Sequence, residues 1–295
     1  MLRLGAEHAQ VQVKQPMTQT LVPNASQDSQ PPSGMSRAEL EAHKQAFAED
    51  GYVVIKHVVP RDKLADLHAQ ISMEYARQKA DGTLFNGGGG LSGHLNCFPG
   101  EAARFVYEAL KECGIVDLIR EISPMAVREP HLGCNLNLPG SVTQQMHMDR
   151  TFRNEFMIAN VSVVDTDLVN GATDVVPGSH KHFLKYWQYV LTGKEREHKR
   201  LPSEAGDVLI RVSNLWHRGM PNHSSQPRPM LAFTWDGGGS AVADPFAENE
   251  GKITFFPNWF APTRKGRIIE RMFVKAPITY KTYRFINSIF SDKSY

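Results

Sequence analysis

From Val127 onward, the sequence alternates short stretches of strand-forming residues with turn-forming groups of Gly, Pro, Asn and Asp. The expected strands cover roughly residues 127–138, 142–149, 155–164, 173–177, 207–212 and 228–235. The turns between them are Pro139-Gly140, Asn170-Gly171, Pro177-Gly178 and Ala205-Gly206-Asp207. Many short strands after a helical start predict a jelly roll, so the expected fold class is mainly β with flanking helices.

The N-terminal part of the chain has a different character. Residues 1–35 are rich in Gln, Ser, Pro and Asn with little apolar periodicity, which predicts a disordered tail. The remaining residues, 36–295, are expected to form one domain that ends in a C-terminal extension. Apolar residues at helical spacing predict helices over 36–50, about 60–80 and 101–122, with a strand at 52–55.

A glycine-rich segment, residues 82–93, separates the second and third of these helices. Glycine-rich chain does not pack as a regular element, so we expect a mobile loop that ends at His94 and Asn96. Two interpretations remain open, a lid that closes over a site and a solvated linker. Residues 183–200 are expected to form a partly helical insertion, and residues 253–295 to pack on the barrel or on another subunit.

The charge balance bears on partners. Lys and Arg total 33 against 31 Asp and Glu, a net charge of +2, so neither nucleic acid nor a membrane is expected as a partner. A small-molecule substrate is expected instead, and homo-oligomer formation is left open. The three cysteines are odd in number and lack metal-ligand spacing, which predicts buried free thiols in a reducing compartment. Because no membrane-spanning or secretory segment is expected, the predicted location is cytoplasmic.

One histidine and one carboxylate point to metal chemistry. His147 and Asp149 are two residues apart in an expected strand, so their side chains leave the same face. An isolated pair of this kind is common by chance, but His217 adds a second imidazole, and two imidazoles with one carboxylate leave one face of an iron open. Arg228 lies in a later apolar strand, where its guanidinium group can hold a dicarboxylate. The alternative is a cupin-like binding or structural protein that holds a metal such as zinc without oxygen chemistry.

Four segments together resemble a known family. They are Phe47 to Ile55 (FAEDGYVVI), Pro139 to Asp149 (PGSVTQQMHMD), Asn170 to Lys181 (NGATDVVPGSHK), and Gly206-Asp207 through His217 to Arg228. Over residues 47–235 the chain resembles the phytanoyl-CoA dioxygenase (PhyH) family of iron(II)- and 2-oxoglutarate-dependent oxygenases. The resemblance implies a double-stranded β-helix, the cupin-like jelly roll.

The resemblance also implies roles for individual residues. His147, Asp149 and His217 match the iron ligands of the family, and Arg228 matches the arginine that holds the far carboxylate of 2-oxoglutarate. Gln144 and Thr173 match polar residues that steady this cosubstrate. For His180 and Trp216 we favour structural roles, as a loop histidine bonded to backbone and a packing residue.

The implied reaction uses iron(II), 2-oxoglutarate and O2, with ascorbate as a candidate reductant. Decarboxylation of 2-oxoglutarate to succinate yields an oxidant that removes hydrogen from a small-molecule metabolite. Related enzymes that halogenate lack the carboxylate ligand, whereas Asp149 is present here. Hydroxylation is therefore the expected outcome, with desaturation or cyclisation as alternatives.

Two points concern the pocket. Strict strand alternation from His147 would turn Gln145 inward and Gln144 outward, so the expected role of Gln144 requires a bulge or a strand start at this place. A polar substrate pocket is expected. Its candidate residues lie on the same strand face as the iron ligands, on the preceding strand and at the end of the glycine loop. The candidate substrate residues are His94, Asn96, Asn135, Asn137 and Arg153, and none of them indicates a CoA-binding feature.

Overall fold

The computed structural model describes residues 34–85, 88–149, 155–236 and 244–291. Contacts separate residues Met1–Gln30 from Pro31–Tyr295, and every element below belongs to the second unit. Residues 1–33 of the expected disordered tail lie outside the described part, so that expectation stays a prediction. No described helix is long and apolar enough to cross a bilayer.

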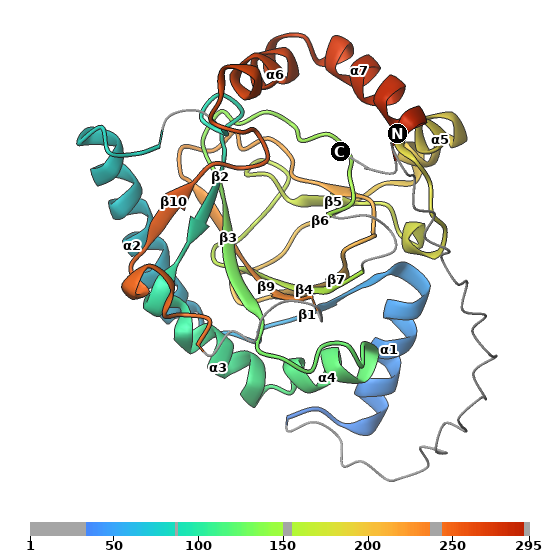
Figure 1. Ribbon diagram of the computed structural model, residues 1–295. Coiled ribbons are helices and arrows are strands. Elements are labelled where there is room, and N and C mark those ends of the chain that lie inside the picture. Colours follow the sequence, from blue (N-terminus) through green and yellow to red (C-terminus); the bar gives the residue numbers. More distant parts are fainter. Residues whose placement is uncertain (1–33, 86–87, 150–154, 237–243, 292–295) are drawn as a thin grey trace, which may run out of the picture. The chain divides into compact units, whose positions relative to one another are not determined.

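The strands form two antiparallel sheets (Figure 1). The large sheet has the order β1 (Tyr52–Ile55), β7 (Val208–Val212), β4 (Met157–Ser162), β9 (Arg228–Trp235), β3 (His131–Asn137), β2 (His94–Phe98) and β10 (Thr254–Phe256). The small sheet has the order β6 (Lys199–Leu201), β5 (Thr173–Val175) and β8 (His217–Arg218). The predicted β core with flanking helices is confirmed.

The helices and short 3-10 turns surround these sheets. The helices are α1 (Arg37–Asp50), α2 (Arg61–Ala80), α3 (Arg104–Glu112), α4 (Ile115–Ile122), α5 (Tyr186–Thr192), α6 (Arg264–Lys275) and α7 (Pro277–Phe290). The 3-10 turns are η1 (Gly100–Ala103), η2 (Ser179–Lys181), η3 (Lys194–Glu197) and η4 (Glu248–Gly251). A capping box begins the first helix, because Ser36 and Glu39 exchange backbone and side-chain hydrogen bonds.

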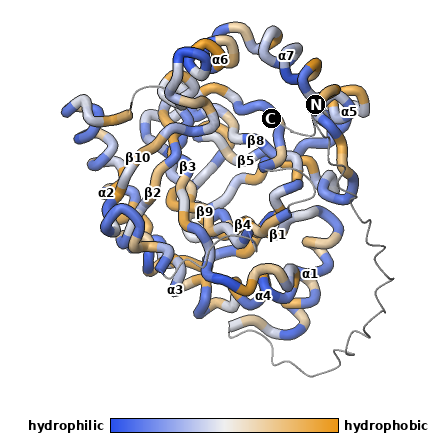
Figure 2. Tube along the Cα trace, in the orientation of Figure 1, coloured by the Kyte–Doolittle hydropathy of each residue, from blue (hydrophilic) through white to orange (hydrophobic). Residues whose placement is uncertain are grey.

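The main hydrophobic core lies between the large sheet and the helices α1 to α4 (Figures 1 and 2). Helix α2 contributes Leu64, Leu67 and Ile71, each fully buried. Because side chains alternate along a strand, Leu95 and Cys97 of β2 enter this core while His94 and Asn96 face the other way. The helix-covered face of the sheet is therefore apolar, and polar side chains gather on its opposite face.

Three expectations about elements are wrong. The single helix expected over 101–122 is broken into α3 and α4, because Gly114 adopts a left-handed φ of 74° between them. The loop expected to continue through Asn96 instead becomes β2 at His94, since this segment pairs with both β3 and β10. The strand expected over 142–149 contributes only an isolated bridge at His147.

The C-terminal extension packs on its own chain, the first of the two alternatives considered. Helix α7 lies against α5 (Figure 1), where the backbone N–H of Trp187 donates to Ser288 Oγ at 2.9 Å. Arg284 of α7 donates to the Met146 carbonyl at 3.1 Å, one residue from His147. Its guanidinium group also lies 3.9 Å from the centre of the Tyr186 ring.

Helix α6 holds the glycine-rich segment through one buried carboxylate. Glu270 Oε1 accepts from the backbone N–H groups of Gly89, Leu91 and Ser92 at 2.9, 3.1 and 3.1 Å. The residue is only 1% exposed, so these bonds are shielded from water. This arrangement favours a fixed wall over a lid for residues 88–93.

We predict that Glu270→Ala lowers the free energy of unfolding by about 2 kcal/mol or more, because it leaves three N–H groups without their acceptor. Glu270→Gln keeps a carbonyl oxygen and should lose less. Denaturant unfolding of both variants measures the difference. Midpoints equal to that of the parent protein in both variants would show that water replaces the carboxylate.

Candidate metal centre

Three predicted ligands meet in one cluster. The ligand atoms of His147, Asp149 and His217 all lie within 4.8 Å of one another. Asp149 Oδ1 is 3.8 Å from His147 Nε2 and 3.5 Å from His217 Nε2. The chain therefore offers two imidazole nitrogens and one carboxylate oxygen around one point, a donor set that fits a non-haem iron.

Backbone pairing brings these residues together. His147 and His217 each donate an N–H to the other's carbonyl at 2.9 Å. The next backbone bond along this pair runs from the Gln144 N–H to the Gly219 carbonyl at 2.9 Å. Between the two bonded positions, the first segment advances by three residues (144 to 147) and the second by only two (217 to 219), so the first segment contains one extra residue. This extra residue is the bulge that the role of Gln144 required.

The same pairing separates the ligands from an apolar cluster. Met146 and Met148 alternate with the two ligands and pack with Trp216, which stacks on Tyr189 at 4.1 Å. Trp216 is thus a packing residue, as expected. The alternation leaves His147 and Asp149 on one shared face.

Hydrogen bonds set the tautomer of both imidazoles. His147 Nδ1 lies 2.8 Å from the Gln145 carbonyl and His217 Nδ1 lies 2.9 Å from the Leu215 carbonyl. A carbonyl only accepts, so each Nδ1 carries the proton and each Nε2 presents its lone pair to the cluster. Burial is the main cause that lowers the pKa of His147 to about 3, which keeps its imidazole neutral.

Arg211 is a functional residue that the sequence analysis missed. Its Nη1 donates to Asp149 Oδ2 at 2.6 Å, and its Nε donates to Asn160 Oδ1 at 3.0 Å. Burial by itself raises the pKa of Asp149, but Arg211 and then His217 hold it well below its usual value. The one available sequence signal was a charged residue inside the apolar strand Val208–Val212.

Arg228 is a buried cation in the large sheet. It begins β9 and pairs with Asn137, which in turn pairs with His94, so the three residues form a row across the large sheet. Arg228 is 3% exposed, and its Nη2 donates to the carbonyl of Gly171 at 3.2 Å, just before β5 of the small sheet. Its Nε has no partner in the described part of the chain, and burial lowers its pKa to about 10. The group remains charged at neutral pH, and an anionic ligand would satisfy it.

The two other cosubstrate candidates are also buried. Gln144 Oε1 accepts from the Gly219 N–H at 2.7 Å, which fixes the end of the His217 strand. Thr173 of β5 lies near Met230, with Oγ1 to Sδ at 3.9 Å. Thr173 alternates with Asp174, which turns to the other face of the small sheet and pairs with Arg218 at 2.8 Å. Their contact with a cosubstrate stays a prediction.

Four of the five candidate substrate residues share one face of the large sheet. His94 pairs with Asn137 and Asn96 pairs with Asn135 across β2 and β3. His94 Nε2 lies 2.7 Å from the Val142 carbonyl, and burial is the main cause that lowers the pKa of His94 to about 4. Arg153 lies outside the described residues.

Trp259 is a second missed residue. Its ring centroid lies 6.3 Å from that of His147 and 6.2 Å from that of His94. It belongs to the C-terminal extension, whose role the sequence analysis left open between packing on the barrel and on another subunit.

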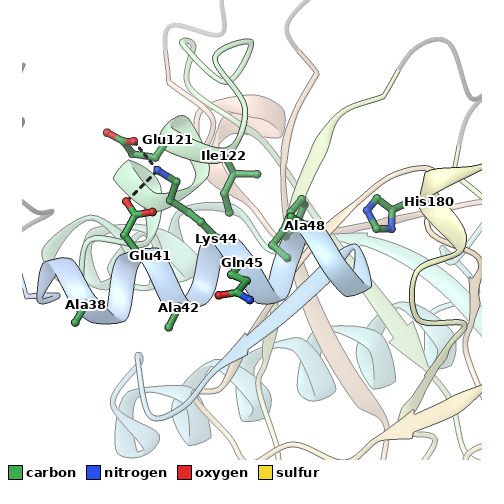
Figure 3. Close-up of a pocket in the computed structure, with 10 residues that line it drawn as sticks. Ala38, Glu41, Ala42, Lys44, Gln45, Ala48, Glu121, Ile122 and His180 are labelled. Atoms are coloured by element: carbon green, nitrogen blue, oxygen red, sulfur yellow. Dashed lines mark hydrogen bonds and ion pairs between the residues drawn. The ribbon is translucent and has the colours of Figure 1, made fainter. Parts of the chain in front are cut away.

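A separate surface hollow of about 820 Å³ lies between α1 and α4 (Figure 3). Its lining includes Glu41, Lys44, Glu121 and His180. Lys44 forms ion pairs with both carboxylates. The backbone of Ala48 bonds the His180 ring, so the structural role favoured for this histidine holds. None of the residues that line the hollow belongs to the metal cluster.

The model of one protein family, phytanoyl-CoA dioxygenase (PhyH), matches residues 47–230. The chain belongs to this family. It is therefore an iron(II)- and 2-oxoglutarate-dependent non-haem oxygenase. The match contains His147, Asp149, His217 and Arg228, and it ends before the C-terminal extension.

Solved structures show the same fold. The epimerase SnoN, in complex with Fe3+, alpha ketoglutarate and nogalamycin RO, is 20% identical, with 67% of this chain and 83% of that chain covered and a TM-score of 0.52. AviO1 from Streptomyces viridochromogenes Tue57 is 19% identical, with 71% of this chain and 100% of that chain covered and a TM-score of 0.51. The carbocyclase SnoK from nogalamycin biosynthesis is 16% identical, with 70% of this chain and 86% of that chain covered and a TM-score of 0.50. The predicted jelly roll is confirmed.

We predict that Arg211→Met weakens iron(II) binding by roughly 10- to 100-fold, because Asp149 loses the partner that fixes its orientation and charge. Anaerobic calorimetry with iron(II) measures the change. Arg211→Lys keeps the charge and should lose less. Arg104→Met, at an exposed pair with Glu101, is the matched control and should bind iron as the parent does. Unchanged affinity in Arg211→Met would contradict this role.

Proposed function

We propose that this protein hydroxylates a small-molecule substrate at an iron held by His147, Asp149 and His217. The observation that carries the proposal is the presence in one chain of this three-ligand cluster and of Arg228, a buried cation whose Nε has no partner among the described residues. A metal alone would not require Arg228. A dicarboxylate that chelates the metal at one end and meets Arg228 at the other would explain both features.

The residues of the chain prepare the site in three ways. The Gln145 and Leu215 carbonyls hold the His147 and His217 imidazoles in the tautomer that a metal needs. Arg211 keeps Asp149 ionised and leaves Oδ1 toward the imidazoles. Arg228 orients the far carboxylate of 2-oxoglutarate, and its burial strengthens that pairing by excluding water. Iron(II) with 2-oxoglutarate and O2 supplies the oxidant that takes hydrogen from the substrate, with release of succinate and carbon dioxide.

The carboxylate ligand favours oxygen insertion. Asp149 lies beside both imidazoles, so it would hold the iron with them and would take the place that a halide would need. The similar structures SnoN and SnoK are an epimerase and a carbocyclase, so enzymes on this fold carry out reactions other than hydroxylation. The product therefore has to be measured.

The function is tested by turnover with a metabolite panel. Protein loaded with iron(II), 2-oxoglutarate and ascorbate is given labelled O2 and excess chloride, and succinate and product mass are recorded. We expect one compound to stimulate succinate formation and to gain one labelled oxygen. His217→Ala should abolish both signals, because it removes one ligand. Stoichiometric iron and parent turnover in that variant would overturn the ligand assignment, and a chlorinated product would overturn that of Asp149.

We predict that Arg228→Ala weakens 2-oxoglutarate binding by about a hundredfold or more, since a bidentate charge-assisted pair is worth a few kcal/mol. Anaerobic calorimetry on the metal-loaded protein measures it, and metal affinity without 2-oxoglutarate should stay unchanged. Lys181→Ala is the control, because Lys181 is an exposed basic residue at the end of η2. Loss of affinity in Lys181→Ala alone would move the anchor to that residue.

This experiment also separates the oxygenase from a metal-holding protein without oxygen chemistry. A protein of the second kind would bind the metal through the same three ligands. It would show no affinity for 2-oxoglutarate that depends on Arg228.

A further inference from the structure

Trp259 presents an exposed indole ring next to the metal cluster. The side chain is 45% exposed, although its sequence neighbours Asn258 and Phe260 are 8% and 3% exposed. Its ring lies 6.3 Å from His147, one of the three clustered ligands, between centroids. A large aromatic side chain gains nothing for folding from the part that it leaves in water. That exposed surface is therefore available to a ligand at the site.

The backbone that carries Trp259 is held in place. The side chain of Asn258 donates to the His94 carbonyl at 2.8 Å and accepts from the Phe260 N–H at 3.1 Å. The Asn258 N–H donates to the Gly88 carbonyl at 2.7 Å, and Asn96 donates to the Pro257 carbonyl at 2.9 Å. These bonds tie the segment to β2 and to the glycine-rich wall. A platform fixed before binding loses little conformational entropy when a ligand stacks on it.

Other aromatic rings support the indole. Phe260 lies 5.4 Å from it between centroids, and Phe273 of α6 meets it edge-on at 6.5 Å and 90°. Phe260 and Phe273 belong to a small apolar cluster with Tyr280 of α7. The rigid C-terminal helices thereby fix where the indole lies relative to His147.

The wall beside the indole is rich in amides. Asn96 and Asn135 pair across β2 and β3, and both side chains are partly exposed. The Asn96 amide already donates to the Pro257 carbonyl, directly before the Asn258-Trp259 segment. An alkyl chain placed here would exclude water from the Asn135 amide and from the side-chain oxygen of Asn96, which is unfavourable. A ring that carries hydroxyl groups would meet both the flat indole and the amides.

We propose that Trp259 is a substrate platform, on which a ring that carries hydroxyl groups stacks beside the iron. Both a phenolic ring and a sugar ring combine hydroxyl groups with a face that stacks on an indole, which is the π face in the phenol and a face of C–H groups in the sugar. The inference rests on the proposed function, since it places the substrate of that same reaction. It also assigns a specificity role to the C-terminal extension, which lies outside the family match at residues 47–230.

The test measures probe binding by saturation-transfer NMR. The full chain is loaded with zinc and 2-oxoglutarate so that no turnover occurs, and the probes are catechol, methyl β-D-glucopyranoside and 1-hexanol. We expect at least one ring probe to bind more tightly than hexanol, and the preferred ring identifies an aromatic or a sugar substrate. Trp259→Leu should weaken ring binding by about threefold to tenfold, and Trp259→Phe should retain most of it.

Controls separate this inference from the proposed function. Phe290→Leu removes another exposed aromatic residue of the extension and should bind the ring probes as the parent does. Affinity for 2-oxoglutarate should be the same in Trp259→Leu and the parent, which also shows that the variant is folded. Equal ring affinities in Trp259→Leu and the parent, or ring probes no tighter than hexanol, would overturn the platform. Absence of 2-oxoglutarate binding in the parent would instead overturn the proposed function.

Discussion

The site depends on one short piece of backbone pairing. His147 and His217 exchange two N–H···O bonds of 2.9 Å, which join the segment after β3 to β8 of the small sheet. This pairing brings the two imidazole rings to a centroid distance of 4.5 Å. It also sets which side chains face the cluster, because Met146 and Met148 turn away into an apolar cluster.

The charges of Asp149 and Arg228 are compensated in two different ways. Asp149 has an internal partner, Arg211, so its charge is balanced within the chain. Arg228 is more deeply buried than Asp149, but no carboxylate of the described residues pairs with it. An unpaired buried cation is costly unless a ligand completes it. The proposed dicarboxylate would supply that completion, which makes the resting protein and its cosubstrate complementary.

The C-terminal extension adds a second layer to this centre. Glu270 fixes the glycine-rich segment, Asn258 fixes the end of β2, and Arg284 bonds the carbonyl of Met146 beside a proposed ligand. Glycine is required where the layers touch: a Cβ on Gly88 would collide with Pro257 and the Phe260 carbonyl, and φ there is 53°. The glycine run thus permits close packing against the extension, in place of the loop motion that its composition first indicated.

The sequence by itself predicted most of the strand-and-turn pattern and the spacing of His147 and Asp149, because alternation and turn chemistry are local properties. The family resemblance implied the roles of Arg228, Gln144 and Thr173, which stay predictions. The sequence also indicated that a bulge was needed near Gln144. The family match and the fold agree with that outline.

Only the tertiary structure decided the long-range features. Three contacts join segments that are far apart in the chain. Arg211 pairs with Asp149, Glu270 binds the glycine-rich wall, and Trp259 lies beside His147. The strand at His94–Phe98 likewise exists because β3 and β10 flank it, although its glycine-rich approach indicates a loop. Local pattern limits which face a side chain takes, but the partner across a sheet or beneath a helix is chosen by packing of the whole chain.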